Sequence, residues 1–329
     1  MANTVPMIVK NSEGVIRQLG EKLAEGGEGA VYPVLDHPDI LVKCYHQNII
    51  TERGQSLQNK IETMISMRDS MENIPVIWPR LKVYGENSKW AGYAMRRAVG
   101  VPMIKMAHTM LYKKYFPQID RKKVVAYLYN LLVVIESLHK RRIFIGDFNL
   151  NNIFLDPKSD RVTLIDCDSY QISYQGQYHA CPVGSPDMTP IEHHGKDFSQ
   201  VIRSQESEAF SVAIVLFKSL MLGRHPYDIV GGEDPVTNMQ IGNFAYGKGN
   251  RGIPKGSWYL IWSHMPHSLK DAFIQTFTLG ARDPKQRLSI ADWKEVLQRY
   301  RREMDKGWHE AAIVPAQVKS ATYRGTNSV

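Results

Sequence analysis

Two polar segments that flank a short apolar hairpin restrict the fold of this chain more than any other feature. In the first segment, Asp147 precedes Asn152 by five positions. In the second, Asp166 ends the apolar run 162–165. The apolar residues of 121–140 recur at spacings of three and four, which predicts an amphipathic helix before the first segment. Asp and Asn also form ordinary turns, but this placement between a helix and a hairpin favours a functional site.

These polar side chains have the chemistry that phosphoryl transfer requires. That reaction asks the protein mainly to position the reacting groups and to neutralise charge. Asp147 would orient the attacking hydroxyl and accept its proton. Mg²⁺ is a hard cation that prefers oxygen ligands and keeps several waters. The carboxylate of Asp166 and the amide oxygen of Asn152 therefore suffice to hold Mg²⁺, or Mn²⁺ in its place.

A glycine-rich segment lies between two predicted strands near the start of the chain. Its glycines are Gly26, Gly27 and Gly29. Backbone without Cβ atoms can approach phosphate oxygens closely, although a glycine-rich hairpin is also a common turn. Val31 follows, and Lys43 lies on the next apolar strand, where its ammonium would be costly to bury without an anion. We expect this region to bind the phosphates of ATP.

Lys43 needs an acidic residue to hold it in place. The helix predicted after its strand offers Glu62, with Glu52 as a competing candidate. Either carboxylate also suits a solvated helix face. We expect Glu62 to complete the nucleotide site as the partner of Lys43.

The predicted elements divide the chain into two lobes of an α+β molecule. Residues 1–97 favour short strands and one helix, because β-branched and aromatic runs alternate with Gly, Pro, Asp and Asn. Residues 98–305 are mainly helical, and 306–329 form a polar tail that we expect to be flexible. The clearest predicted elements are strands at 30–34, 40–45, 81–84, 90–95, 153–155 and 162–165, and helices at 121–140, 209–222, 269–279 and 290–300.

The composition is that of an ordinary globular protein with an excess of positive charge. The net charge of +8 suits acidic partners, but the basic residues form short, scattered clusters. A nucleic-acid-binding function rests on charge alone, and no specific nucleic acid is expected. The three cysteines lack metal-ligand spacing and are expected to be reduced thiols. Without an apolar run of roughly 18 residues or a basic-then-apolar start, we expect a cytoplasmic protein that does not bind membranes.

The two polar segments, 143–155 and 162–168, resemble motifs of the protein kinase superfamily. Asp147 and Asn152 match its catalytic loop, and Asp166 stands at the metal-binding Asp of the Asp-Phe-Gly motif. The resemblance implies a bilobal protein kinase-like fold, with a small β-rich N-lobe and a larger α-helical C-lobe. It also implies that ATP and Mg²⁺ bind between the lobes.

Further matches follow in the order expected of a kinase. The resemblance places Phe154 beneath the adenine and Met95 at the linker between the lobes, where a buried aromatic and an ordinary linker residue are the alternatives. Glu192 ends a segment similar to the close of a kinase activation segment, and is implied to form a buried ion pair with Arg287. Glu208 stands where an Asp usually anchors the catalytic loop.

Three positions depart from the kinase pattern. Gly146 replaces the arginine of His-Arg-Asp, so regulation through a phosphorylated activation loop is less expected. Asn149 replaces a lysine that many Ser/Thr kinases use near the transferring phosphate. Cys167 replaces the Phe of Asp-Phe-Gly, and Asp168 replaces its Gly.

The combined motifs are similar to those of a bacterial group of eukaryotic-like Ser/Thr protein kinases. Members often occur beside a partner phosphatase and a von Willebrand A-type protein, which the resemblance implies as partners. The expected function is ATP- and Mg²⁺-dependent phosphorylation of Ser and Thr hydroxyls of a protein substrate and of the kinase itself. A nucleotide-binding pseudokinase that serves as a signalling scaffold is the alternative, because Asn149 and the Asp-Cys-Asp sequence are altered.

Overall fold

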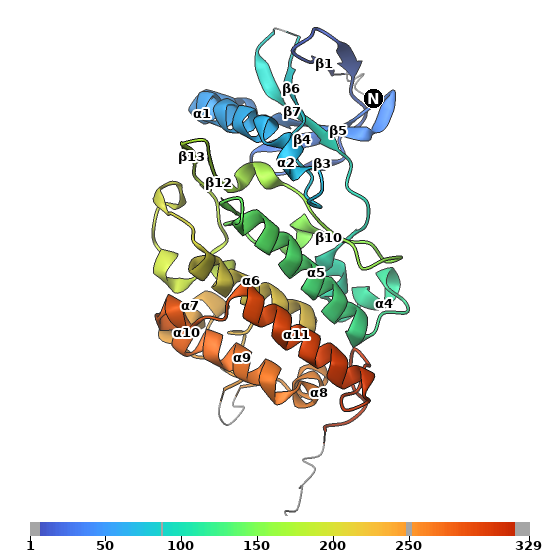
Figure 1. Cartoon of the computed structure of the whole chain (residues 1–329), viewed down its shortest axis with the longest axis vertical. Helices are drawn as coiled ribbons and strands as arrows, with labels where there is room; N and C mark the ends of the chain where they lie inside the picture. Colours follow the sequence, from blue (N-terminus) through green and yellow to red (C-terminus); the bar gives the residue numbers. More distant parts are fainter. Residues whose placement is uncertain (1–6, 87, 248–251, 320–329) are drawn as a thin grey trace, which may run out of the picture.

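The protein has a sheet-rich upper lobe and a helical lower lobe, joined near residue 97 (Figure 1). The computed structural model describes residues 7–86, 88–247 and 252–319. The bilobal α+β prediction is confirmed. Among the described residues, no helix is long and apolar enough to cross a membrane.

The upper lobe is built on one antiparallel sheet with a helix packed against it. The spatial order of its strands is β2-β1-β6-β7-β5-β4-β3. The bounds are β1 Ile8–Lys10, β2 Ile16–Gln18, β3 Ala24–Glu25, β4 Gly29–Val34, β5 His37–Tyr45, β6 Leu81–Tyr84 and β7 Trp90–Arg96, with helices α1 Gln47–Ser66 and α2 Arg68–Met71 between β5 and β6. Lys43 lies on the central strand β5, opposite Val31 on one side and Tyr93 on the other.

The lower lobe packs its helices around α5 and α6, with short strands at the boundary between the lobes. Its α-helices are α3 Met103–Met106, α4 Leu111–Tyr115, α5 Arg121–His139, α6 Gln205–Leu220, α7 Pro235–Ile241, α8 Ser257–His264, α9 His267–Phe277, α10 Leu279–Arg282 and α11 Ile290–Asp305. The strands are β8 Val101–Pro102, β9 Ile143–Phe144, β10 Ile153–Leu155, β11 Val162–Leu164, β12 Gln171–Tyr174 and β13 Gln177–His179. Single 3-10 turns occur at η1 Leu150–Asn152, η2 Cys167–Ser169, η3 Pro186–Met188, η4 Ile191–His193, η5 Phe198–Gln200 and η6 Pro284–Gln286.

Helix α5 begins where the sequence places a capping residue. The side chain of Asp120 accepts a hydrogen bond from the backbone N–H of Lys123 at 2.8 Å, which satisfies a donor that the first turn leaves free. Most of its apolar side chains are buried, with Val133 exposed, and they supply the core on which the strands at the lobe boundary rest. The side chain of Ser204 begins α6 in the same way, through the N–H of Ser207 at 3.2 Å.

The two lobes also meet through backbone. The N–H of Ile77, from the upper lobe, donates to the carbonyl of Leu164 on β11 at 2.8 Å. In return, the N–H of Leu164 donates to the carbonyl of Pro75 at 2.9 Å. The segment that leads into the sheet is therefore tied to the strand that precedes Asp166.

The segment after α11 differs from the flexible tail that the sequence predicts. Ile313 is buried, and the N–H of Arg121 donates to the carbonyl of Ala311 at 2.7 Å. The Arg121 guanidinium, itself buried, donates to the carbonyls of Leu220 and Ile313. Residues 311–313 thus lie over the start of α5, where the carbonyl of Ile313 accepts from the buried guanidinium of Arg121, and residues 317 and 319 contact α8 instead. The rest of the predicted tail, 320–329, lies outside the described residues.

Candidate active site

A cavity of about 490 Å³ opens between the two lobes. This volume lies within the range of small-molecule sites. Ten of the residues predicted from sequence line it, all except Glu62: Gly26, Gly27, Gly29, Val31, Lys43, Met95, Asp147, Asn152, Phe154 and Asp166. The fold brings these positions together from four separate parts of the chain, and the cavity has an apolar portion beside its charged one.

The three glycines of the loop have different surroundings. A Cβ on Gly26 or Gly27 would meet nothing within 4 Å, whereas a Cβ on Gly29 would lie 2.3 Å from the carbonyl oxygen of Cys44. Gly29 is therefore required by the pairing of β4 with β5, and only Gly26 and Gly27 leave open space for a ligand. Glu28 also lines the cavity, and its carboxylate forms an ion pair with Arg53 of α1, which offsets part of its negative charge.

Lys43 is paired with Asp168, and the prediction that Glu62 holds it is wrong. The Nζ atom donates to both carboxylate oxygens of Asp168, at 2.8 and 2.9 Å, and to Asp166 at 2.7 Å. Glu62 faces away and pairs with Lys82 at 2.5 Å. The physical reason is the orientation of α1, which places Glu62 on its exposed side over β6.

Asp168 is a buried carboxylate with every contact needed to keep it ionised. Besides Lys43, the hydroxyls of Tyr45 and Tyr93 donate to it at 2.6 and 3.0 Å. Burial alone would raise the pKa of Asp168, but the charge of Lys43 and these hydrogen bonds outweigh burial and lower the pKa. Burial would likewise lower the pKa of Lys43, and the charges of Asp168 and Asp166 raise it instead. The pair is therefore a fixed buried ion pair.

Sequence reasoning did not assign Asp168 this role. The sequence does show an acidic residue, Asp168, at the position of the Gly of Asp-Phe-Gly, and this residue could have indicated a partner for Lys43. Its meaning depends on η2, which turns the chain just after Asp166 and directs the Asp168 side chain towards β5 and β7. Asp166 itself has φ +60°, a left-handed conformation that Asp tolerates better than most residues.

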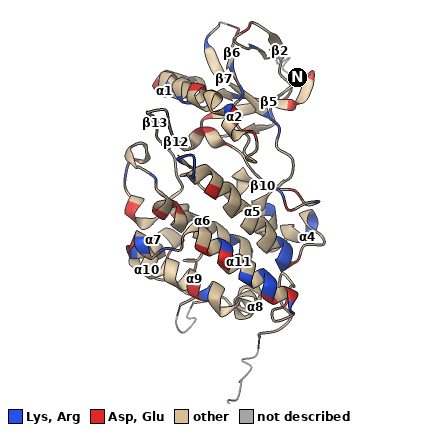
Figure 2. Ribbon diagram, in the orientation of Figure 1, with Lys and Arg blue, Asp and Glu red and all other residues tan. Residues whose placement is uncertain are grey.

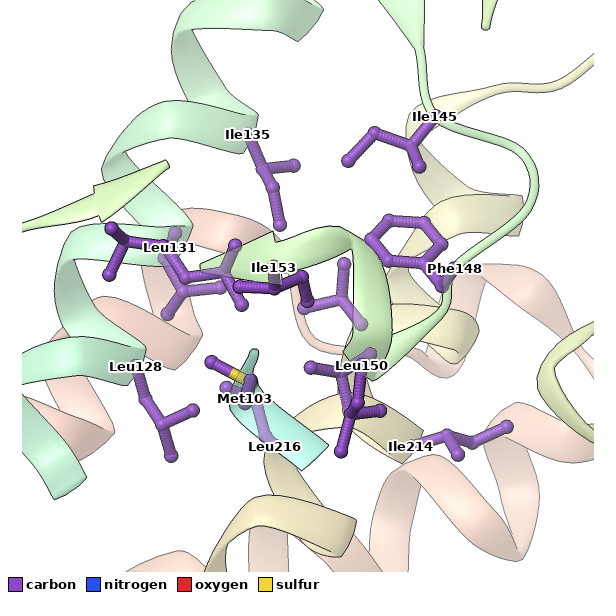
Figure 3. Close-up of a cluster of buried hydrophobic side chains, with 14 of the residues drawn as sticks. Met103, Leu128, Leu131, Ile135, Ile145, Phe148, Leu150, Ile153, Ile214 and Leu216 are labelled. Atoms are coloured by element: carbon purple, nitrogen blue, oxygen red, sulfur yellow. The ribbon is translucent and has the colours of Figure 1, made fainter. Parts of the chain in front are cut away.

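The catalytic-loop candidate is held from below by apolar packing. Phe148 and Leu150 are buried next to Asp147 and point into the cluster formed with α5 and α6 (Figure 3). From the side, Glu208 accepts the N–H of Gly146 at 2.6 Å and contacts His139 at 2.8 Å. Glu208 therefore anchors the loop, in agreement with the sequence-based expectation.

Gly146 stands where a kinase usually has arginine because no side chain fits there. It has φ +70°, and a Cβ would lie 2.6 Å from Sγ of Cys181. The buried guanidinium of Arg203 lies nearby, with Nε 3.4 Å from that Cβ position. Arg203 contacts Nδ1 of His193 at 3.0 Å and donates to the carbonyl of Val183 at 3.4 Å. An arginine from a later segment therefore lies beside the loop.

Asp147 is oriented by Ser185, which lies between β13 and η3. Its Oδ1 atom accepts both the N–H and the hydroxyl of Ser185, at 3.1 and 3.2 Å. Both contacts use one oxygen, which leaves Oδ2 for a further donor. The side chain is thus fixed at the edge of the cavity, where an incoming hydroxyl could meet it.

Asn152 and Asp166 lie at adjoining ends of the hairpin. The N–H of Ile165, directly before Asp166, donates to the carbonyl of Asn152 at 2.9 Å. Both side chains line the cavity. One carboxylate and one amide oxygen at the same wall are a donor set that fits Mg²⁺, the remaining positions being left for phosphate and water.

Asn149 has a structural role in the loop. Its side-chain oxygen accepts the N–H of Asn151 at 2.9 Å and so caps η1. The residue is exposed and brings no positive charge.

The end of β13 and the residue after it are attached to α1 by partly buried polar contacts. The Nζ of Lys60 donates to the carbonyl of Ala180 at 3.0 Å, and burial lowers the pKa of Lys60 to about 8. Thr63, one turn further, contacts His179 at 2.9 Å. Further along, both guanidinium nitrogens of Arg287 bind the carboxylate of Glu192, at 2.7 and 2.8 Å. This ion pair confirms the one expected from sequence, with Arg287 buried and Glu192 partly exposed.

Curated proteins that resemble this chain are named as kinases. It is 29% identical over 280 residues to protein kinase YegI of Escherichia coli strain K12, which covers 82% of the chain and 42% of that protein. The YegI protein of Escherichia coli O157:H7 is 29% identical over 269 residues, or 79% of the chain and 41% of that protein. Serine/threonine-protein kinase 40 of Gallus gallus is 20% identical over 185 residues, or 56% of the chain and 38% of that protein.

The chain spans about two fifths of the length of the curated relatives it matches. No protein-family model matches it. The relatives support a protein kinase-like superfamily. The names of these relatives specify no nucleotide and no metal.

Proposed function

We propose that this chain is an ATP- and Mg²⁺-dependent protein kinase that phosphorylates Ser and Thr hydroxyls of a protein partner and of itself. One observation carries the proposal. The groups that bind phosphate, hold a metal and accept a proton all line the cavity of about 490 Å³, namely Lys43, Asp147, Asn152 and Asp166. Chance does not readily gather this set at the boundary of two lobes.

Each residue has a task that its contacts support. Lys43 binds phosphate oxygens with an ammonium that Asp168 keeps in position. Oδ2 of Asp147 accepts the proton of the attacking hydroxyl, while Oδ1 stays bound to Ser185. The new bond forms between the hydroxyl oxygen and the γ-phosphorus, the bond from that phosphorus to the bridging oxygen breaks, and ADP leaves.

Asp166 and Asn152 would hold Mg²⁺ against the phosphates. When bound, the metal neutralises phosphate charge, which is the chemistry it supplies to phosphoryl transfer. The apolar part of the cavity, which includes Val31, Met95 and Phe154, suits an adenine ring.

Transfer of label from ATP tests the proposal directly. The full chain is incubated with γ-labelled ATP and Mg²⁺, then with Mn²⁺, in the presence of dephosphorylated casein. We expect labelled phosphoserine and phosphothreonine, and a loss of roughly 10²–10⁴-fold in Asp147→Asn. Asp271→Asn, an exposed change on α9, is the matched control. Undiminished transfer by Asp147→Asn would contradict the assignment of the base.

A pseudokinase scaffold is the second candidate, and Asn149 favours it. This residue caps η1 and supplies no charge near the transferring phosphate. ATP-dependent thermal stabilisation without any labelled product, with Mg²⁺ or Mn²⁺, would favour the scaffold. Asp166→Ala is the control, because it should remove metal-dependent stabilisation in either case.

The protein acceptor is also a proposal. The partner phosphatase and the von Willebrand A-type protein implied by the sequence resemblance are the first acceptors to test. If either protein acquires labelled phosphate from this chain but not from its Asp147→Asn variant, the result would support direct transfer.

A further inference from the structure

Five arginines line a groove of about 320 Å³ beside the linker that joins the lobes. One wall is the linker, 96–99, and another is α2 with the residues up to 80. The third is the turn between β10 and β11. Figure 1 shows α2 and β10 close to the junction of the two lobes. Residues 96–98 also line the nucleotide cavity, so the linker separates the two spaces. We call this space the hinge groove, and its arginines are Arg68, Arg80, Arg96, Arg97 and Arg161.

Positive charge in the hinge groove exceeds negative charge. Its carboxylates are Glu72 and Asp156, against five guanidinium groups. Glu72 is already shared by Arg80 and Arg96, at 2.8 and 3.2 Å. The carboxylate of Asp156 accepts from its own turn, where Ser159 donates at 2.7 Å. Within the described part of the chain, neither carboxylate forms an ion pair with Arg68, Arg97 or Arg161, so positive charge remains in excess.

Those three arginines have weak partners or none. Arg161 is exposed, and its guanidinium makes no ion pair or hydrogen bond with the part of the chain that the structure describes. Arg68 lies 3.4 Å from Asp69, its exposed neighbour in sequence. Among the described residues, the guanidinium of Arg97 donates only to the carbonyl of Pro38. In Figure 2 blue positions mark the segment that descends from β7. Guanidinium groups held this way are free to bind carboxylates in a bidentate manner.

The rest of the lining fits a peptide better than a nucleic acid. Val99 is 78% exposed at the edge of the hinge groove, which is unusual for a large apolar side chain that lines a cavity. The one aromatic residue among the lining residues is Trp78, which is buried. Single-stranded nucleic acids need exposed aromatic faces for base stacking, and the hinge groove offers none from this lining.

We propose that the hinge groove docks an acidic segment of a partner protein. Asp or Glu side chains of that segment pair with Arg68 and Arg161, and an apolar side chain of the segment covers Val99. The site is separate from the groups that carry out phosphate transfer. Docking there would hold a partner protein at the linker, while the acceptor hydroxyl of that partner enters the nucleotide cavity on the other side of the linker.

Fluorescence anisotropy of a defined peptide tests this docking without any phosphate transfer. The probe is a fluorescein-labelled 12-residue peptide of Asp and Glu with one central Leu, titrated with the full chain at low salt. We expect saturable binding, and at least tenfold weaker binding in Arg68→Glu/Arg161→Glu. Arg302→Glu is the matched control, because Arg302 is exposed on α11 and its side chain has no partner among the described residues.

Several outcomes would overturn the proposal. The first is that no binding is seen at millimolar concentrations of the protein. The second is that Arg302→Glu loses as much affinity as the double variant. The third is that a control peptide, with Gln in place of every Asp and Glu, binds equally well. Competition by a single-stranded oligonucleotide that depends on Arg161 in the same way would assign the hinge groove to nucleic acid instead. If the charge reversal impairs folding, Arg68→Gln/Arg161→Gln replaces it, because this variant removes the two charges without reversing them. It should also bind the acidic peptide more weakly. Normal labelling of casein beside absent peptide binding would leave the kinase proposal intact.

Discussion

Lys43 donates two hydrogen bonds to the buried carboxylate of Asp168, at 2.8 and 2.9 Å, rather than to any acidic residue of α1. Its partner therefore lies two positions after Asp166, in the segment proposed to hold the metal. The lysine and that segment form one unit. Movement of α1 would not by itself break this ion pair, because α1 supplies neither of its members.

Asp168→Asn should lower phosphate transfer at least about tenfold, while Glu62→Gln should change it less than about twofold. The first change removes the buried charge that positions Lys43, and loss of one member of a buried pair typically destabilises by roughly 3–5 kcal/mol. The second touches only an exposed pair with Lys82. Steady-state rates at saturating ATP and thermal melting check both. Equal damage from the two changes would return the role to Glu62.

Gly146→Ala should destabilise more than Gly176→Ala. Both glycines have positive φ, +70° and +79°, so the backbone strain of about 1–2 kcal/mol is common to both. Only at Gly146 would the new Cβ meet another residue, Cys181, at 2.6 Å. Overpacking of this kind costs roughly a further 1–3 kcal/mol. Urea unfolding measures the difference, and equal losses would show that the contact with Cys181 relaxes freely.

Gly27→Ala and Gly29→Ala should separate ligand binding from folding. A Cβ at Gly27 has open space, so its free energy of unfolding should change by less than about 0.5 kcal/mol, as for other surface changes, while KM for ATP rises. At Gly29 the Cβ would lie 2.3 Å from the carbonyl oxygen of Cys44, so the sheet itself should be destabilised. Kinetics and urea unfolding of the two variants check this, and a stable Gly29→Ala protein would contradict it.

His225 should make the folded protein lose stability in mild acid. Its Nε2 lies 2.7 Å from the carbonyl of Asp187, and its Nδ1 accepts the N–H of Tyr227 at 3.2 Å, so the folded ring is neutral. Burial lowers the pKa of His225 from 6.5 to about 4, with Lys218 adding to the effect. Because only the unfolded state takes up this proton between those values, stability falls as pH decreases from about 6.5 to 4.

The loss from His225 should amount to roughly 2–3 kcal/mol over that interval, at 1.36 kcal/mol for each unit of pKa shift. Urea unfolding at pH 7 and pH 4.5 measures it. His225→Gln should remove this part of the pH dependence, whereas His37→Gln, at an exposed site, should keep it. Identical pH profiles for the two variants would contradict the interpretation.

Local spacing in the sequence was enough for the elements and for most of the candidate site. The helix over 121–140 and the hairpin at 153–165 depend on apolar periodicity within one segment, and the structure has α5, β10 and β11 there. The motifs around Asp147 and Asp166 carry their chemistry in residues that are neighbours in sequence. The Glu192–Arg287 pair was implied by the resemblance to protein kinases rather than by local spacing.

Tertiary structure alone decided which distant side chains meet. The direction in which α1 presents Glu62, and the turn that carries Asp168 to Lys43, depend on how the lobes pack. The same holds for Arg203 beside Gly146, for the position of 311–313 over the start of α5, and for the arginines of the hinge groove. The sequence by itself determined the fold class and the chemical groups, because these follow from local pattern. Only packing could select the partner of each buried charge, since that choice depends on distances between segments remote in sequence.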